Sequence, residues 1–306
     1  MCRVVGYLGR PLLLDSVLFA TDSSLARQTY SPRMMATFLN LAGFGMAAWD
    51  ETSERPDEPF LYKVTSLPVF DRNLKCLAEK VTARCVIAHV RGVTYSEHEV
   101  LTQTNLHPFR FPGVRVTLAH NGHLREFGRM RYDLVGHVDP TFVRYIEGTT
   151  DSEWIYALLL SQLDDPFGNP DAEEIADATV KTLRIVREIR EKHEIETSSP
   201  VNLFVSTGTC LVATRFSFDY GWYPEGDTML ETDLPFVSLW YTLGDEYAQR
   251  DGEWQMGPSD HPQSLLIASE PLTADTSRWL EAPEYSILTA SLRNGGIDAS
   301  IADLDP

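Results

Sequence analysis

Met1-Cys2-Arg3-Val4-Val5-Gly6-Tyr7-Leu8 opens the chain, and the way these residues are interpreted decides how the rest is read. Val4–Leu8 is rich in β-branched and aromatic residues, which is typical of a strand. Cys2 stands directly before that strand, and a small residue at position two permits removal of the initiator Met1. The mature chain would then begin with a residue that carries a thiol and a free α-amine. An α-amine has a pKa of about 7.7–8.0, so it can act as the base for its own thiol.

A cysteine at position two is weak evidence when it stands alone, because many proteins carry an incidental cysteine. The other three, Cys76, Cys85 and Cys210, are scattered and form no C-x-x-C pair. We therefore expect packing roles for these three, with no disulfide framework, no metal site and no cofactor. Other segments have to decide whether Cys2 is reactive.

Length and charge limit the classes of function. The chain has 306 residues, 43% of them hydrophobic, which is enough for a substantial core in one large domain or two smaller ones. Its 26 Lys and Arg against 44 Asp and Glu give a net charge of -18, which argues against nucleic acid as a partner. The longest apolar stretch near the start is interrupted by Asp15 and Ser16. It is too short for a membrane span or a signal peptide, so we expect no membrane partner and a cytoplasmic location.

Hydrophobic patterning predicts many strands and few long helices in one α/β domain. The predicted strands are Val4–Leu8, Val81–Val90, Val114–His120, Val201–Ser206, Cys210–Phe218, Phe236–Leu243, Leu265–Ala268 and Tyr285–Ser291. The predicted helices are one capped by Asp151 or Ser152 that runs to about Leu163, one over Ala172–His193, and a weaker one over Leu14–Leu25.

Two of the predicted strands end in polar side chains. The strand through Cys85 ends in His89 and Arg91, and a guanidinium can hold a carboxylate with two hydrogen bonds. The alternative for Arg91 is a surface ion pair. A second strand runs into Asn121-Gly122, which is a strong hairpin-turn signal. The same two residues can supply a side-chain amide and a backbone N–H to an oxyanion.

Asp151 opens a predicted helix in the segment Thr149-Thr150-Asp151-Ser152-Glu153. The simplest interpretation of such an acid is an N-cap. The alternative is that its carboxylate binds the ammonium group of a substrate.

These segments together resemble the class II glutamine amidotransferases, which are N-terminal-nucleophile hydrolases. The resemblance rests on the order and spacing of five motifs: Met1-Cys2-Arg3, Ala88-His89-Val90-Arg91, Thr104-Asn105-Leu106-His107-Pro108-Phe109, Ala119-His120-Asn121-Gly122 and Thr150-Asp151-Ser152-Glu153. Two later segments, Leu211–Phe216 and Ala268-Ser269-Glu270-Pro271-Leu272, also resemble the family. Each motif is weak alone, but the ordered set is specific.

The resemblance implies an α+β fold, the four-layer αββα sandwich of the N-terminal-nucleophile hydrolases. It makes Cys2 the nucleophile, with Asn121 and Gly122 as the oxyanion hole. It also implies that Arg91 binds the α-carboxylate of the substrate and Asp151 its α-ammonium group. No metal or cofactor takes part. The implied reaction is hydrolysis of the γ-glutamyl amide of glutamine or a γ-glutamyl compound through a Cys2 thioester, releasing glutamate and ammonia or an amine.

The resemblance covers residues 2–290, which we expect to form a single amidotransferase domain, followed by an acidic tail over residues 291–306. This extent is similar to the small, free-standing branch of the family. The implied partner is a small glutamine-like substrate, and an ammonia-accepting synthase subunit is a further candidate. Two alternatives stay open: an N-terminal-cysteine acylase for a non-glutamyl amide, and a non-enzymatic amino-acid-binding protein in which Met1 is retained.

Overall fold

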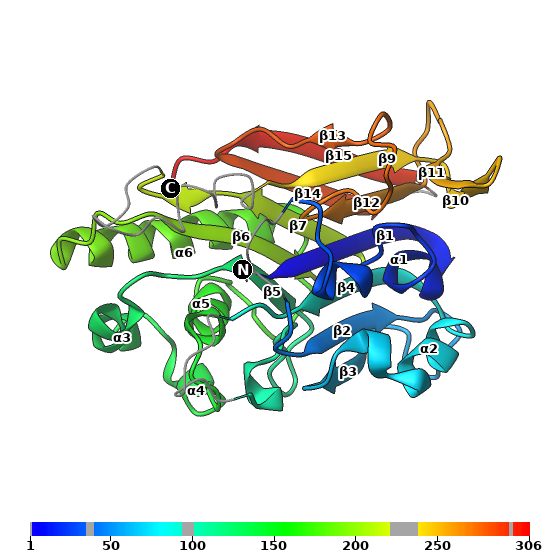
Figure 1. Ribbon diagram of the computed structural model, residues 1–306. Coiled ribbons are helices and arrows are strands. Elements are labelled where there is room, and N and C mark those ends of the chain that lie inside the picture. Colours follow the sequence, from blue (N-terminus) through cyan, green and yellow to red (C-terminus); the bar gives the residue numbers. More distant parts are fainter. Residues whose placement is uncertain (1, 35–39, 94–100, 221–237, 294–295) are drawn as a thin grey trace.

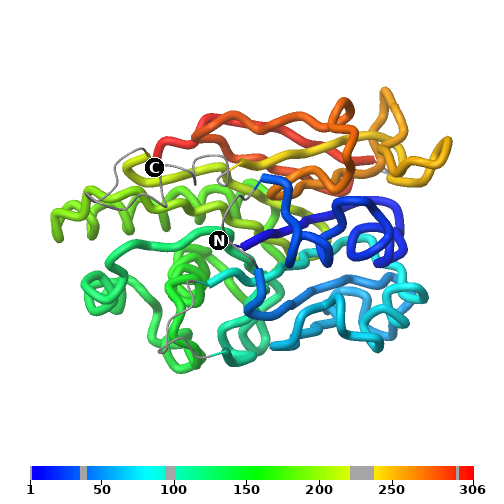
Figure 2. The backbone as a smooth tube through the Cα atoms, viewed as in Figure 1, coloured from blue at the N-terminus to red at the C-terminus, as the bar shows by residue number. Residues whose placement is uncertain are grey.

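Two antiparallel sheets packed face to face form the centre of the protein (Figure 1). The computed structural model describes residues 2–34, 40–93, 101–220, 238–293 and 296–306. Helices cover the outer side of each sheet, and the chain begins near the middle of the molecule, where β1 lies beside β5 (Figures 1 and 2).

The first sheet has seven strands in the order β13-β9-β12-β1-β4-β2-β3. Its strands are β1 (Arg3–Leu13), β2 (Phe44–Trp49), β3 (Phe60–Val64), β4 (Thr82–Val90), β9 (Trp240–Gly244), β12 (Ser264–Ala268) and β13 (Leu280–Glu281). β1 is central, with β4 on one side and β12 on the other. β1 is therefore hydrogen-bonded to a neighbouring strand along both of its edges.

The second sheet has six strands. Five of them lie in the order β15-β14-β7-β6-β5, and β8 pairs with β6. Its strands are β5 (Thr117–Gly122), β6 (Ser199–Ser206), β7 (Cys210–Arg215), β8 (Ser217–Phe218), β14 (Ser286–Arg293) and β15 (Gly296–Asp303). A separate hairpin is formed by β10 (Tyr247–Arg250) and β11 (Glu253–Met256).

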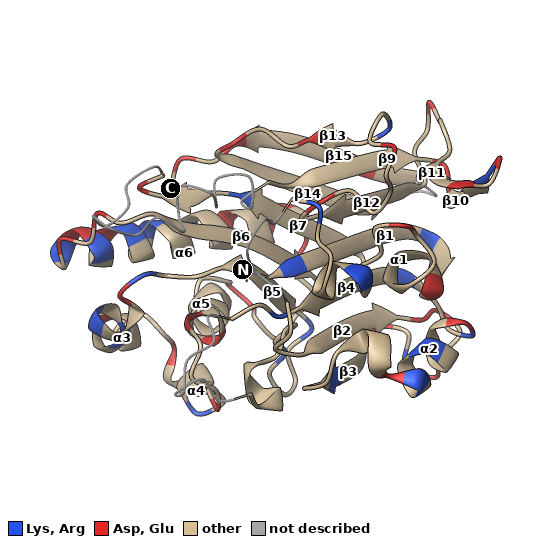
Figure 3. Cartoon of the chain, in the orientation of Figure 1, with Lys and Arg blue, Asp and Glu red and all other residues tan. Residues whose placement is uncertain are grey.

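The helices are divided between the two outer faces. The six-stranded sheet is covered by α3 (Phe127–Val135), α4 (Pro140–Val143), α5 (Asp151–Leu160) and α6 (Ala172–Lys192). The seven-stranded sheet is covered by the shorter α1 (Asp15–Leu18) and α2 (Arg72–Ala78). The described residues also form three single 3-10 turns: η1 (Arg27–Thr29), η2 (Pro68–Phe70) and η3 (Gln103–Asn105). Charged residues gather on α2, α3, α6 and the β10–β11 hairpin (Figure 3).

Side chains alternate between the two faces of each strand, and this alternation builds three apolar layers. In β1, Val4 and Leu8 face the opposite sheet, whereas Val5 and Tyr7 face the outer helices. Phe204 of β6 comes from the other side to meet the layer between the sheets. The outcome is a helix–sheet–sheet–helix sandwich, so the predicted αββα architecture is confirmed.

Most of the predicted elements are present, with shifted ends. β1 extends to Leu13, and the α6 prediction ends one residue too late. The helix predicted from Asp151 or Ser152 has Thr150 as its N-cap, because Thr150 Oγ1 accepts from Glu153 N at 3.4 Å. Residues 236 and 237 of the Phe236–Leu243 prediction lie outside the described residues.

The helix predicted over Leu14–Leu25 is wrong for most of its length. Only α1, of four residues, forms there. Thr21, Asp22, Ser23 and Ser24 follow it, and side chains of these types compete with helical hydrogen bonds. Ser24 N bonds to Thr21 O in a turn instead.

The acidic tail predicted over residues 291–306 is also wrong. β15 pairs with β14 along its whole length, from Gly296 opposite Arg293 to Asp303 opposite Ser286. Ile297 and Leu304 are buried at 8% and 1% exposure, so apolar side chains anchor this strand while its acids face outward. The last residues therefore complete the second sheet.

Within the described residues, no helix is both long and apolar enough to cross a membrane.

We expect Phe204→Ala to lower the free energy of unfolding by about 3–5 kcal/mol, because the ring is fully buried between the sheets. Phe70→Ala is the matched control: Phe70 is 78% exposed, and its loss should change stability by no more than about 0.5 kcal/mol. Urea unfolding of both variants measures the difference. Equal losses would contradict a core between the sheets.

Candidate active site

The Cys2 side chain is buried at the start of β1, with 7% exposure. Gly92 N donates a hydrogen bond to Cys2 Sγ at 3.4 Å, and Gly92 O lies 3.6 Å from the same sulfur. Gly92 follows the end of β4, the strand that pairs with β1. The thiol is thus held at the carboxyl end of β4 by a backbone N–H group.

Arg91 lies between the end of β4 and this glycine, and it is 7% exposed. Its backbone N–H donates to Gly43 O, and its carbonyl accepts from Ala42 N, both at 2.9 Å. These bonds continue the β2–β4 pairing beyond the strands and fix the main chain at Arg91. Arg91, which is predicted to bind the substrate carboxylate, is therefore the sequence neighbour of Gly92, which contacts the Cys2 thiol.

Asn121 and Gly122 form the end of β5 rather than the hairpin turn that their dipeptide favours. They lie opposite Asn202 and Val201 of β6. A Cβ on residue 122 would collide with the Pro200 carbonyl, so only glycine fits this approach of the two chains. Asn121 Nδ2 donates to Ser269 Oγ at 3.1 Å.

The Gly122 N–H group points away from β6. In an antiparallel ladder, the amides of successive residues alternate in direction. His123 N bonds to Pro200 O, on the β6 side, whereas Leu118 N bonds to Phe109 O, on the other side. Gly122 comes four residues after Leu118, so its N–H points to the same side of β5 as the N–H of Leu118. The Gly122 N–H is therefore directed to the side of β5 away from β6, where it can bind an incoming oxygen.

Asp151 is half-buried at the first position of α5. Its Oδ2 accepts from Leu124 N at 2.5 Å, and its Oδ1 accepts from Ser152 N at 2.8 Å. The carboxylate therefore ties the start of α5 to the segment that follows Gly122. This brings Asp151 to the same end of β5 as Asn121.

Ser269 and Glu270 connect these parts, although the sequence assigned them no role. Ser269 Oγ accepts from Val4 N as well as from Asn121 Nδ2, both at 3.1 Å. Glu270, which is fully buried, pairs with Arg3 Nε at 3.1 Å. Burial lowers the pKa of Arg3, and the Glu270 carboxylate opposes that shift. The sequence does contain a signal for them. Ser269 and Glu270 directly follow the apolar strand Leu265–Ala268, just as Arg91 follows the strand through Cys85.

Three buried histidines lie behind the site. His107 Nδ1 accepts from His120 N at 3.1 Å, and His120 Nδ1 lies 2.9 Å from Ser152 Oγ. These two are structural hydrogen-bonding residues. The His89 ring instead packs 4.2 Å from the His107 ring, and neither of its nitrogens has a hydrogen-bond partner within the described residues. Burial lowers the pKa of all three histidines, which keeps them neutral.

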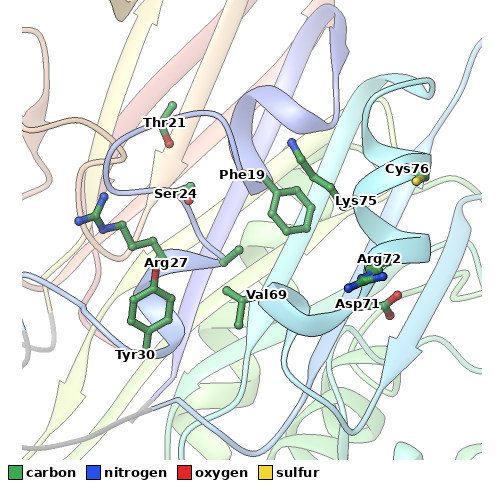
Figure 4. Close-up of a pocket in the computed structure, with 11 residues that line it drawn as sticks. Phe19, Thr21, Ser24, Arg27, Tyr30, Val69, Asp71, Arg72, Lys75 and Cys76 are labelled. Atoms are coloured by element: carbon green, nitrogen blue, oxygen red, sulfur yellow. The ribbon is translucent and has the colours of Figure 1, made fainter.

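A cavity of about 520 Å³ lies elsewhere, between residues 19–30 and α2 (Figure 4). Its wall includes Phe19 and Val69, with Arg27, Arg72 and Lys75 also lining it. None of the five predicted site residues lines it, so it is separate from the candidate site. No group of three or more His, Cys, Asp or Glu side chains in the described part of the chain could hold a metal ion.

The predicted residues therefore meet at one end of β1 and β5. Cys2 contacts Gly92, the neighbour of Arg91. Asn121 reaches β1 through Ser269, and Asp151 holds the chain just beyond Gly122. A thiol, a side-chain amide donor and a backbone N–H donor are the groups that nucleophilic attack on an amide carbonyl requires. The αββα sandwich is also the architecture of the N-terminal-nucleophile hydrolases.

Comparison with known proteins identifies the family. The model of the class-II glutamine amidotransferases matches residues 12–303. The probable glutamine amidotransferase DUG3 of Saccharomyces cerevisiae is 30% identical over 307 residues, covering 94% of this chain and 81% of the yeast protein. The gamma-glutamyl-hercynylcysteine sulfoxide hydrolase of Mycolicibacterium smegmatis is 25% identical over 266 residues, covering 85% of this chain and 94% of that protein.

The fold has a counterpart among solved structures. A glutamine aminotransferase class-II domain protein from Silicibacter pomeroyi superposes with a TM-score of 0.61 at 22% identity, over 100% of both chains. The chain belongs to the class II glutamine amidotransferase family and is an amidohydrolase-type enzyme. The family match begins after Cys2, so the role of this residue depends on the geometry described above.

We expect Lys63 to make stability rise with pH between about 8 and 10. Its ammonium lies 5.3 Å from the Phe109 ring centroid, and burial lowers its pKa from 10.5 to about 8. Between these values the unfolded chain binds the proton and the folded chain does not, so raising the pH favours folding. Lys63→Met should remove this rise.

Denaturant unfolding of the native protein and Lys63→Met at pH 7, 8, 9 and 10 measures the effect. The comparison cancels the opposite contribution of Cys85, whose pKa burial raises to about 12. Parallel stability curves for the two proteins would show that Lys63 is not the cause.

Proposed function

We propose that this enzyme hydrolyses the γ-glutamyl amide bond of glutamine or of a γ-glutamyl compound through a thioester on Cys2. The observation that carries the proposal is the arrangement of the Cys2 thiol, the Asn121 amide and the Gly122 N–H, which points away from β6, at one end of β1 and β5. The two curated relatives support the substrate class, since one is named as a probable glutamine amidotransferase and the other as a gamma-glutamyl-hercynylcysteine sulfoxide hydrolase.

The proposed reaction begins once Met1 has been removed. The freed α-amine takes the thiol proton, and the sulfur attacks the Cδ carbonyl of the substrate. Gly92 N–H already donates to this sulfur and stabilises negative charge on it. The carbonyl oxygen becomes an oxyanion, which Asn121 Nδ2 and Gly122 N stabilise. One such donor lowers the barrier by about 3 kcal/mol.

The tetrahedral intermediate then collapses. The C–N bond breaks, the leaving nitrogen takes the proton held by the α-amine, and ammonia or an amine departs. The α-amine next removes a proton from water, which attacks the thioester carbonyl. The C–S bond breaks, and glutamate and the free thiol are released.

In this proposal Arg91 and Asp151 hold the head group of the substrate. A guanidinium matches an α-carboxylate, and a carboxylate matches an α-ammonium group. Asp151 Oδ1 and Oδ2 each already accept a backbone hydrogen bond. Oδ1 also accepts from Ser152 Oγ at 3.1 Å. Each carboxylate oxygen has about two acceptor positions, so Oδ2 is the one that retains capacity for a substrate N–H.

We expect a diazo-ketone analogue of glutamine to add one molecule to the N-terminal peptide of the native protein. Cys2→Ala should not be labelled, and its turnover of glutamine should fall at least about 10³-fold. Intact mass and peptide mapping measure labelling, and they also report whether Met1 is removed. Labelling at Cys76, which is exposed, in place of Cys2 would refute the proposal.

We expect Arg91→Lys and Asp151→Asn to raise KM for glutamine by about 10–100-fold, because each weakens a charge-assisted contact with the head group. Steady-state kinetics with ammonia and glutamate readouts measure this. Arg84→Lys is a matched control, since Arg84 lies on β4, the strand that leads to Arg91, but pairs with Glu51. Unchanged KM values in both site variants would favour the acylase alternative.

A panel of γ-glutamyl substrates separates the two roles open to the enzyme. Glutamine as the best substrate would indicate ammonia supply to a synthase partner. Preference for γ-glutamyl peptides would indicate a free-standing hydrolase.

A further inference from the structure

Ser269 continues the pairing of β12 with β1 beyond the last strand residue. The regular register ends with Ala268 opposite Val5. Ser269 N then donates to Val4 O at 2.9 Å, and Val4 N donates to Ser269 Oγ at 3.1 Å. A side-chain hydroxyl thus replaces a backbone carbonyl as the acceptor for Val4, two residues after Cys2.

The same hydroxyl oxygen holds the amide of Asn121. Asn121 Nδ2 donates to Ser269 Oγ at 3.1 Å, which turns the NH₂ group toward β1. The amide has a second N–H, which can donate to an incoming oxygen. Ser269 is 1% exposed, so water does not compete for these bonds. One atom therefore links the strand of the nucleophile to the proposed oxyanion donor of the other sheet.

Glu270 fixes the nucleophile residue from a different side. Its carboxylate accepts from Arg3 Nε at 3.1 Å, and Arg3 Nη1 donates to Cys2 O at 3.2 Å. The same carboxylate accepts from the backbone N–H groups of Arg33 and Met34 at 3.0 and 3.1 Å. Both Arg3 and Glu270 are fully buried.

We propose that Ser269 and Glu270 are positioning residues that together set the Cys2 thiol and the Asn121 amide in register for attack on the substrate carbonyl. Neither residue touches the substrate in this arrangement. Ser269 acts through Asn121, and Glu270 acts through Arg3 on the main chain of Cys2. The inference rests on the proposed function, in which Cys2 is the nucleophile.

The energetic argument concerns alignment. A donor stabilises an oxyanion only when it lies within about 2.7–3.1 Å of the position that the oxygen reaches. A misplacement of about 1 Å can cost about 10²-fold in rate. Loss of the Ser269 hydroxyl frees the Asn121 amide to rotate, but leaves Arg91 and Asp151 in place. The effect should therefore fall on kcat and not on KM.

Kinetics of Ser269→Ala, Asn121→Ala and the double variant test this with glutamine as substrate. We expect Ser269→Ala to lower kcat by about 10–100-fold while KM changes less than about threefold. In the Asn121→Ala background the same change should cost less than about threefold, because the two act as one unit. Independent, multiplicative losses in the double variant would overturn the inference for Ser269.

Ser264→Ala is the matched control. Ser264 is equally buried on β12, but it bonds to Tyr7 and to Asp245 O at the other end of the strand. It should lose stability and keep its kcat. A kcat loss equal to that of Ser269→Ala would mean that any buried hydroxyl of β12 has this effect, which contradicts the proposal.

Alkylation of Cys2 by iodoacetamide tests Glu270 with a readout independent of the oxyanion donors. Glu270→Gln removes the negative charge that pairs with Arg3 beside Cys2, so the pH profile of alkylation should move to lower pH while kcat falls. Arg3→Lys keeps the charge and loses the bond to Cys2 O. It should lower kcat by about tenfold without moving the profile, and it covers the case in which Glu270→Gln fails to fold.

The outcomes separate the two proposals. If Cys2 of the native protein is not required for turnover, the proposed function fails. If the native protein depends on Cys2 but Ser269→Ala and Arg3→Lys retain native kcat, only the positioning inference fails.

Discussion

Arg3 and Glu270 form an ion pair from which solvent is wholly excluded, and the rest of the site is built around it. Removing one partner of such a pair typically costs about 3–5 kcal/mol, because the other charge is left buried without compensation. Glu270 also binds the backbone N–H groups of Arg33 and Met34, and Arg3 binds the carbonyl of Cys2. A shift of β1 along β12 would break these contacts together. The pair therefore fixes where the chain begins relative to the sheet.

Fixing the start of β1 matters because the second sheet supplies the other half of the site. Asn121 and Gly122 belong to β5, which is held by β6 and by the α5 segment at Asp151. The two halves of the site meet where the two sheets pack together. There Ser269 Oγ links them, because it accepts hydrogen bonds from Val4 N of one sheet and Asn121 Nδ2 of the other. The apolar layer sets the distance between the sheets, whereas this polar contact sets the register of the reacting groups. A close-packed apolar layer alone would tolerate small shifts of one sheet against the other, whereas the reaction requires close alignment of the thiol and the oxyanion donors.

The fold was predictable where strands are buried on both faces. Val81–Val90 and Val201–Ser206 are rich in apolar residues, and both stretches form interior strands. β15 was missed because it lies at an edge: its two acids, Asp298 and Asp303, are exposed and resemble those of an acidic tail. β2 was also missed, since its glycine and alanines have weak strand propensity. It is a strand because neighbours bury both of its faces. Propensity is local, whereas burial depends on partners that are distant in the sequence.

The candidate site was likewise predictable where the local sequence is sufficient, and not where contacts between distant residues decide a role. Cys2, Arg91, Asn121, Gly122 and Asp151 could be proposed because each stands at the end of an element, where side chains reach a shared edge. Gly92 could not be chosen by type, since its contribution is a backbone N–H whose direction depends on the β2–β4 pairing. Ser269 and Glu270 stand at an equivalent place after β12, yet their function lies in bonds to residues 148 and 267 positions away. A serine hydroxyl and a carboxylate acquire such roles only when folding removes water from them. The sequence can therefore mark the ends of strands as places for chemistry, whereas which of those residues react and which position others is decided by the packing of the two sheets.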